Sequence, residues 1–140
     1  MILIQVIGAF IAVVSVAITF GVPKKFLTYS GIVGAIGWFI YLIFEKTGLS
    51  SVSRMFLAAL VVALVSHSYA RLKKAPVTIF LIAGILPLVP GVGMYRIVYS
   101  ILTNDNALAA FYFSETMQIA GMIALAIFIM DTIFRNFQKN

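Results

Sequence analysis

The sequence predicts an all-α, polytopic membrane protein with about five transmembrane helices, and two observations lead to this fold class. Of the 140 residues, 63% are hydrophobic and only 10% are charged, whereas a soluble domain carries about 25% charged residues. Several apolar stretches also approach the roughly 20 residues that cross a bilayer. These observations exclude a soluble globular domain and a disordered chain, and the absence of cysteine excludes a disulfide scaffold. We expect residues 1–140 to form a single membrane domain within the lipid bilayer.

Five apolar stretches mark the expected spans. We place them at approximately residues 2–22, 27–45, 52–70, 76–103 and 107–134. The first has no basic segment before its apolar run and no obvious small-residue cleavage site, so we interpret it as a retained span rather than a signal peptide. The third is expected to extend outward past Arg54, because a long basic side chain can reach the interface.

The basic residues divide unequally between the two sides that five spans create. One side has only Lys46 and Arg54, and the other has seven residues: Lys24, Lys25, Arg71, Lys73, Lys74, Arg135 and Lys139. Lys and Arg concentrate on the cytoplasmic side of membrane proteins. We therefore expect a multi-pass protein of the bacterial plasma (inner) membrane, with the N-terminus outside and the C-terminus in the cytoplasm. The same rule explains the formal net charge of +6, and we expect no nucleic-acid partner.

The fourth span is expected to be broken at a PLVPG motif. Pro87 and Pro90 lie in the middle of the apolar run and are followed by Gly91 and Gly93. Each proline removes a helix hydrogen bond, and the freed backbone is tolerated in a membrane only inside protein or beside a cavity. Interrupted helices form substrate sites in secondary transporters, and the N-terminus of the second half-helix favours an anion. The alternative is a structural kink without a ligand.

Two charges lie inside the expected spans. We interpret Asp105 and Asn106 as the turn between the last two spans, and Arg96 and Glu115 are equidistant from it. Residues equidistant from the turn of an antiparallel hairpin share one height, so the two are candidates for an ion pair. Ionisable residues within a membrane often mark substrate or proton pathways. Arg96 is therefore expected to bind substrate and Glu115 to carry a coupling proton, unless they form a structural pair near the outer interface.

Other polar groups carry weaker signals. Tyr95 and Tyr99 flank Arg96 and complete the candidate substrate-binding set, although tyrosine is also common at membrane interfaces. The sequence has no Ser/His/Asp set, paired carboxylates or cluster of metal ligands. We therefore expect no enzyme activity, no cofactor and no metal site.

The segment from Pro76 to Tyr95, with basic residues before Pro76 and PLVPG followed by a tyrosine, resembles the threonine/serine exporter family. It is most similar to the short, all-membrane subunit of two-component members. This resemblance implies an export carrier for small polar acids, either threonine and serine or dicarboxylates such as succinate. It also implies a larger membrane subunit as partner. Only Pro87, Pro90, Gly91 and Tyr95 are carried over from the family.

The leading functional hypothesis is therefore one subunit of a proton-coupled secondary exporter whose substrate is a small polar carboxylate. Two alternatives remain at this point. One is a non-transporting membrane scaffold that stabilises a partner, and the other is a small channel. A homo-oligomer is also left open, because five spans make only a small enclosure.

Overall fold

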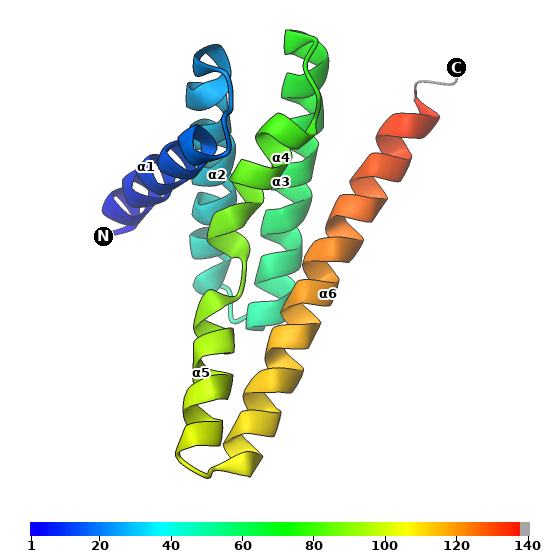
Figure 1. The fold of residues 1–140 in the computed structure, drawn as a ribbon. Coiled ribbons are helices and arrows are strands. Elements are labelled where there is room, and N and C mark those ends of the chain that lie inside the picture. Colours follow the sequence, from blue (N-terminus) through cyan, green and yellow to red (C-terminus); the bar gives the residue numbers. More distant parts are fainter. Residues whose placement is uncertain (138–140) are drawn as a thin grey trace.

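The computed structural model describes residues 1–137, and within them every regular element is helical. In chain order these elements are α1 (Ile2–Thr19), α2 (Lys24–Glu45), α3 (Ser51–Lys73), α4 (Thr78–Ile85), the 3-10 turn η1 (Leu86–Leu88), α5 (Gly91–Leu102) and α6 (Asn106–Asn136) (Figure 1). Four helices are long and apolar enough to cross a membrane, and the bent segment from α4 to α5 makes a fifth candidate. These features confirm the predicted fold class.

Helix α2 is the centre of the bundle, because it packs against α1, α3 and α4. Helix α6 packs against α3 and α5, and in residues 1–137 helix α5 has no neighbouring helix other than α6. Figure 1 shows the consequence: α5 and the first half of α6 form a hairpin that extends beyond the ends of α2 and α3. Among the described residues, no helix covers one face of this hairpin.

Close approach of the helices depends on small residues of α2. A Cβ atom at Gly34 would meet the side chain of Val13 on α1, and a Cβ atom at Gly37 would meet Val62 on α3. Both valines are fully buried. Small residues let helix backbones approach in lipid, where dispersion contacts rather than water exclusion hold helices together.

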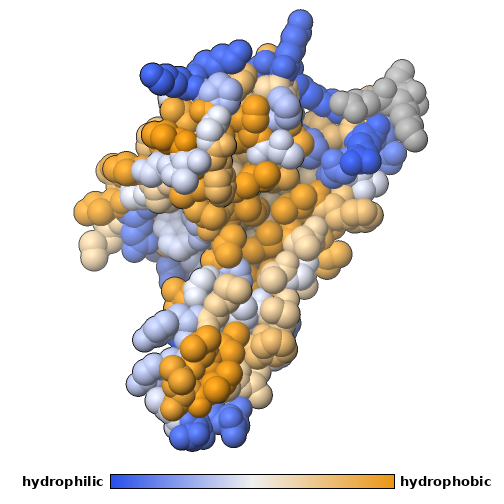
Figure 2. Space-filling model, viewed as in Figure 1, coloured by the Kyte–Doolittle hydropathy of each residue, from blue (hydrophilic) through white to orange (hydrophobic). Residues whose placement is uncertain are grey.

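The charged residues gather toward the ends of the molecule. On the face drawn in Figure 2, hydrophobic residues cover most of the middle. Helices α2 and α4 begin at the end where α3 and α6 finish (Figure 1), so Lys24, Arg71 and Arg135 lie at one end of the bundle. Lys139, which we counted with this basic group, lies outside the described residues. This distribution is that of a multi-pass membrane protein.

Candidate functional site

The fourth span is interrupted at the PLVPG motif, as predicted. Pro87 lies within η1, Val89 is extended, and Pro90 caps the N-terminus of α5. The two halves of the span meet at an angle of 46°. A proline lacks the amide hydrogen and clashes with the preceding turn, and two prolines three residues apart therefore end one helix and allow another to begin.

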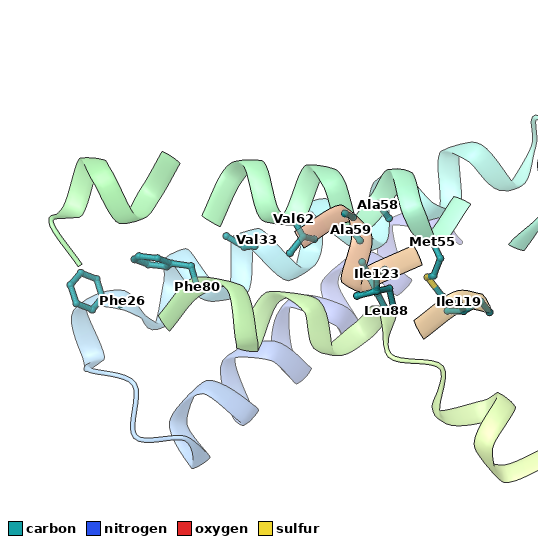
Figure 3. Close-up of a cluster of buried hydrophobic side chains, with 11 residues drawn as sticks. Phe26, Val33, Met55, Ala58, Ala59, Val62, Phe80, Leu88, Ile119 and Ile123 are labelled. Atoms are coloured by element: carbon teal, nitrogen blue, oxygen red, sulfur yellow. The ribbon is translucent and has the colours of Figure 1, made fainter. Parts of the chain in front are cut away.

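Leu88 anchors this break in the core. Its side chain is fully buried, and Figure 3 shows it close to Met55, Ile119 and Ile123. These three residues belong to α3 and α6. The neighbouring Leu86 is 37% exposed. The interrupted backbone is therefore held by one inward-facing leucine, with its conformation fixed by packing as well as by the prolines.

The first turn of α5 has free backbone donors. In the break, the amide of Gly91 donates to the carbonyl oxygen of Val89 at 2.8 Å, and that of Met94 donates to Pro90 at 3.2 Å. Among residues 1–137, the amides of Val92 and Gly93 have no acceptor. The first amides of any helix lack intrahelical partners, and they carry the positive end of the helix dipole. Here they are directed toward the break.

A cavity of about 250 Å³ opens beside the break. Its walls come from α2, α3, α5 and α6 and from the PLVPG segment. Polar and aromatic side chains of these four helices meet there. The lining residues are Trp38, Tyr41, Ser51, Met55, Pro87, Val89, Pro90, Gly91, Val92, Gly93, Arg96, Tyr112, Glu115, Thr116 and Ile119. We call this space the break cavity.

Most of the candidate residues from the sequence line the break cavity. The six that do so are Pro87, Pro90, Gly91, Gly93, Arg96 and Glu115. Tyr95 and Tyr99 are not among the lining residues. Their rings stack on each other at 6.1 Å, and the residues are 67% and 57% exposed. Their role in substrate binding stays a prediction.

The register of the α5–α6 hairpin differs from the expected one. Helix α5 ends at Leu102 and α6 begins at Asn106, so the turn is centred on Asn104, whose φ of 60° is left-handed. Asp105 is the N-cap of α6 and accepts a hydrogen bond from the amide of Leu108 at 3.0 Å. Arg96 is consequently opposite Tyr112, and its guanidinium lies 5.3 Å from the centroid of the Tyr112 ring.

Glu115 lies about one turn farther along α6, near Gly93 rather than Arg96. The neighbouring Thr116 is 3% exposed, and it occupies the space where a Cβ atom at Gly93 would stand. Within residues 1–137, the ion pairs closer than 4.0 Å join Arg54 with Glu45 and Arg135 with Asp131, and His67 Nε2 lies 3.9 Å from Asp131 Oδ1. Arg96 and Glu115 thus share a cavity without direct contact in this conformation.

Sequence reasoning missed the wall that α2 and α3 contribute. Trp38 and Tyr41 stack at 5.2 Å, and Arg54 lies behind this wall with its guanidinium 5.0 Å from the Tyr41 ring. Arg54 donates to Ser51 Oγ at 3.2 Å, and its Nε is buried without a partner among the described residues. The outer-side location of Arg54 stays a prediction. The short turn between α2 and α3 places Tyr41 and Met55 at one height, but nothing in the sequence places that height beside the PLVPG segment.

The described residues contain no group of three or more His, Asp or Glu side chains that could hold a metal ion. The break cavity instead offers one cation, one carboxylic acid, hydroxyl groups and free amides. This set can bind a small anionic or zwitterionic molecule and can take up or release a proton.

A membrane bundle with an interrupted helix beside a polar cavity is an architecture typical of secondary transporters. A family model described as "Threonine/Serine exporter, ThrE" matches residues 5–133. The chain therefore belongs to the threonine/serine exporter family, which confirms the resemblance found in the sequence. No solved structure matches the chain.

Proposed function

We propose that this chain is one subunit of a proton-coupled secondary exporter for small polar carboxylates, and that the break cavity is its substrate site. The observation that supports this most is the shared lining: the interrupted helix, Arg96 and Glu115 border one space. Threonine, serine and dicarboxylates such as succinate all carry the carboxylate that this site would recognise. The chemistry is transport without covalent change, so we propose no enzyme activity.

The substrate carboxylate would bind between Arg96 and the free amides of Val92 and Gly93. A guanidinium offers several donors to a carboxylate, and the helix N-terminus adds positive potential. Drug-sized ligands occupy pockets of about 300–1,000 Å³, and the cavity of about 250 Å³ suits a smaller molecule. The aromatic wall of Trp38 and Tyr41 would exclude water from the rest of the substrate.

Glu115 would carry the coupling proton. It is partly buried and lines the cavity without an ion-pair partner within 4.0 Å among residues 1–137. A carboxylate in such a position can be protonated when the cavity faces one side and deprotonated when it faces the other. Arg96 would approach Glu115 when substrate is absent. The ion pair expected from the sequence would then form in one state of the transport cycle.

The larger partner subunit would cover the exposed face of α5. That face includes Val92, Tyr95 and Tyr99, which are 66%, 67% and 57% exposed. Within the described residues α5 contacts only α6, so a second subunit could complete the transport path there. Tyr95 and Tyr99 would then reach the substrate from the interface between subunits. A homo-oligomer would use the same face.

The orientation follows from the distribution of charge. We propose that the end of the bundle with Lys24, Arg71 and Arg135 faces the cytoplasm of a bacterium, because basic residues concentrate there. The hairpin turn at Asn104 would then face outward, and the break cavity would lie on the outer side of the spans. Export would end with release from this cavity.

Reconstitution tests this proposal. The chain is placed in proteoliposomes with and without its larger subunit, and uptake or release of labelled serine, threonine and succinate is followed under a proton gradient. We expect saturable flux of at least one of these acids in the complete complex. Flux of none of them would overturn the exporter and favour a scaffold, whereas non-saturable ion conductance would indicate a channel.

A further inference from the structure

A second cavity lies at the other end of α6, in the end of the bundle that carries most of the basic residues. It has a volume of about 480 Å³. We call it the basic cleft, and its lining residues are His67, Ala70, Arg71, Lys74, Ala75, Pro76, Val77, Asp131, Phe134 and Arg135. It shares no lining residue with the break cavity. The exporter site therefore does not account for it.

The cleft lies where α6 diverges from α4. Helix α6 packs on α3 but has no contact with α4 in residues 1–137, and Figure 1 shows α6 leaning away from α4 toward its C-terminal end. Ala70, Ala75 and Pro76 contribute small apolar side chains to its lining. The cleft thus lies between candidate transmembrane helices at the basic end of the bundle.

Two of the cations that line the cleft, Arg71 and Arg135, contact residues of α6. Arg71 donates from Nη2 to the carbonyl oxygen of Phe134 at 2.7 Å, and its guanidinium lies 4.6 Å from the centroid of the Phe134 ring. Arg135 pairs with Asp131, with Nε to Oδ2 at 2.7 Å. Asp131 therefore offsets Arg135, and Arg71 and Lys74 leave the cleft with an excess of positive charge.

Lys74 occupies a strained position. Its φ of 49° and ψ of 48° are left-handed, and the amide of Ala75 donates to the carbonyl oxygen of Ala70 at 3.0 Å. This is the position after a helix that usually carries glycine, because a side chain there costs energy. Lys74 also lines the cleft.

We propose that the basic cleft binds a phosphate group, supplied by the headgroup of an anionic phospholipid. Arg71 and Lys74 would bind the phosphate oxygens, and the apolar side of the cleft at Pro76 and Val77 would hold the start of an acyl chain. Basic pockets between transmembrane helices bind anionic headgroups in this way. The bound lipid would join α6 to the α3–α4 loop, where the helices of this chain leave a gap.

Native mass spectrometry of the delipidated full-length chain tests the site, with phosphatidylglycerol, phosphatidylcholine or inorganic phosphate added. We expect one tightly bound phosphatidylglycerol and no comparable binding of phosphatidylcholine. The variant Arg71→Gln/Lys74→Gln should weaken that binding about tenfold, since each basic residue near an anionic surface contributes appreciable attraction. The control Lys24→Gln/Lys25→Gln removes the same charge from the same end and should leave it unchanged.

A third variant separates binding from folding. Lys74→Gly relieves the left-handed backbone and removes the ammonium, so it should keep or raise the melting temperature while weakening phosphatidylglycerol binding. The proposal would be overturned if Lys24→Gln/Lys25→Gln weakened phosphatidylglycerol binding as much as Arg71→Gln/Lys74→Gln does. It would also be overturned if the wild-type chain bound phosphatidylcholine as tightly as phosphatidylglycerol. Competition by millimolar inorganic phosphate would assign the site to the phosphate group itself, and absence of competition would assign it to the intact lipid. Transport activity plays no part in these readouts.

Discussion

The guanidinium of Arg96 lies 5.3 Å from the centroid of the Tyr112 ring, and Arg96 is the one cation among the described residues that line the break cavity. It links the second half of the broken span to α6. A cation over an aromatic face gains about 0.5–1 kcal/mol at an exposed site. The ring also holds the guanidinium beside the break cavity, where we propose that the substrate carboxylate binds.

Replacing the Tyr112 ring is expected to weaken substrate binding. Tyr112→Leu removes the aromatic face and should raise the KM for export about threefold, in line with the energy of an exposed cation–π contact. Tyr112→Phe retains the ring and serves as the matched control, with a KM near that of the wild type. Concentration-dependent flux in proteoliposomes measures both. An equal rise in KM for the two variants would assign the effect to the hydroxyl group instead.

Leu88 should determine the stability of the break. Leu88→Ala leaves a hole beside Met55 and Ile119, and large-to-small changes at buried sites cost about 2–5 kcal/mol. Leu86→Ala, two residues earlier and 37% exposed, should cost about 0.5 kcal/mol or less. Thermal unfolding in detergent compares them. Similar melting temperatures for the two variants would show that the prolines alone hold the break.

Close packing between Gly93 and Thr116 should make this glycine intolerant of a side chain. A Cβ atom at Gly93 would collide with Thr116 Oγ1, whereas Gly91 has nothing within 4 Å. Gly93→Ala is expected to cost about 1–3 kcal/mol, and Gly91→Ala should be neutral or slightly stabilising. Adding Thr116→Ala to Gly93→Ala should recover part of the loss in melting temperature. No recovery would contradict direct contact as the cause.

The sequence was sufficient to predict the helical class and the interruption, because both follow from composition and from the chemistry of proline. It was not sufficient to predict the register of the last hairpin. The sequence places the centre of the turn between Asp105 and Asn106, whereas Asp105 caps α6 and the centre is Asn104. The residue of α6 that lies opposite Arg96 is therefore three positions earlier than expected. It is Tyr112 rather than Glu115.

The contribution of α2 and α3 to the cavity could not be predicted for a different reason. Trp38, Tyr41 and Ser51 are ordinary residues of their own segments, and the packing of α2 and α3 against η1 brings them to the break. Arg54 is a similar case, because its contact with the Tyr41 ring depends on the packing of α3 against α2. The packing of these two helices against η1 has no local pattern in one sequence.

The proposed orientation has a direct test, since the chain contains no cysteine and single-cysteine variants label cleanly. Lys46→Cys should react with a membrane-impermeant maleimide in intact cells. Lys24→Cys should react only after the membrane is permeabilised. Both positions are exposed, so accessibility within the protein does not limit either reaction. The reverse labelling pattern would place the basic end outside.

The most direct test of the proposed mechanism is proton-driven flux through the complete complex with Glu115→Gln. The neutral side chain keeps the shape of the cavity but cannot carry a proton, so accumulation driven by a pH gradient should fall to background while substrate exchange without a gradient persists. Glu45→Gln makes the same change at an exposed glutamate and should retain driven flux. Undiminished gradient-driven transport by Glu115→Gln would contradict the assignment of Glu115 as the coupling residue.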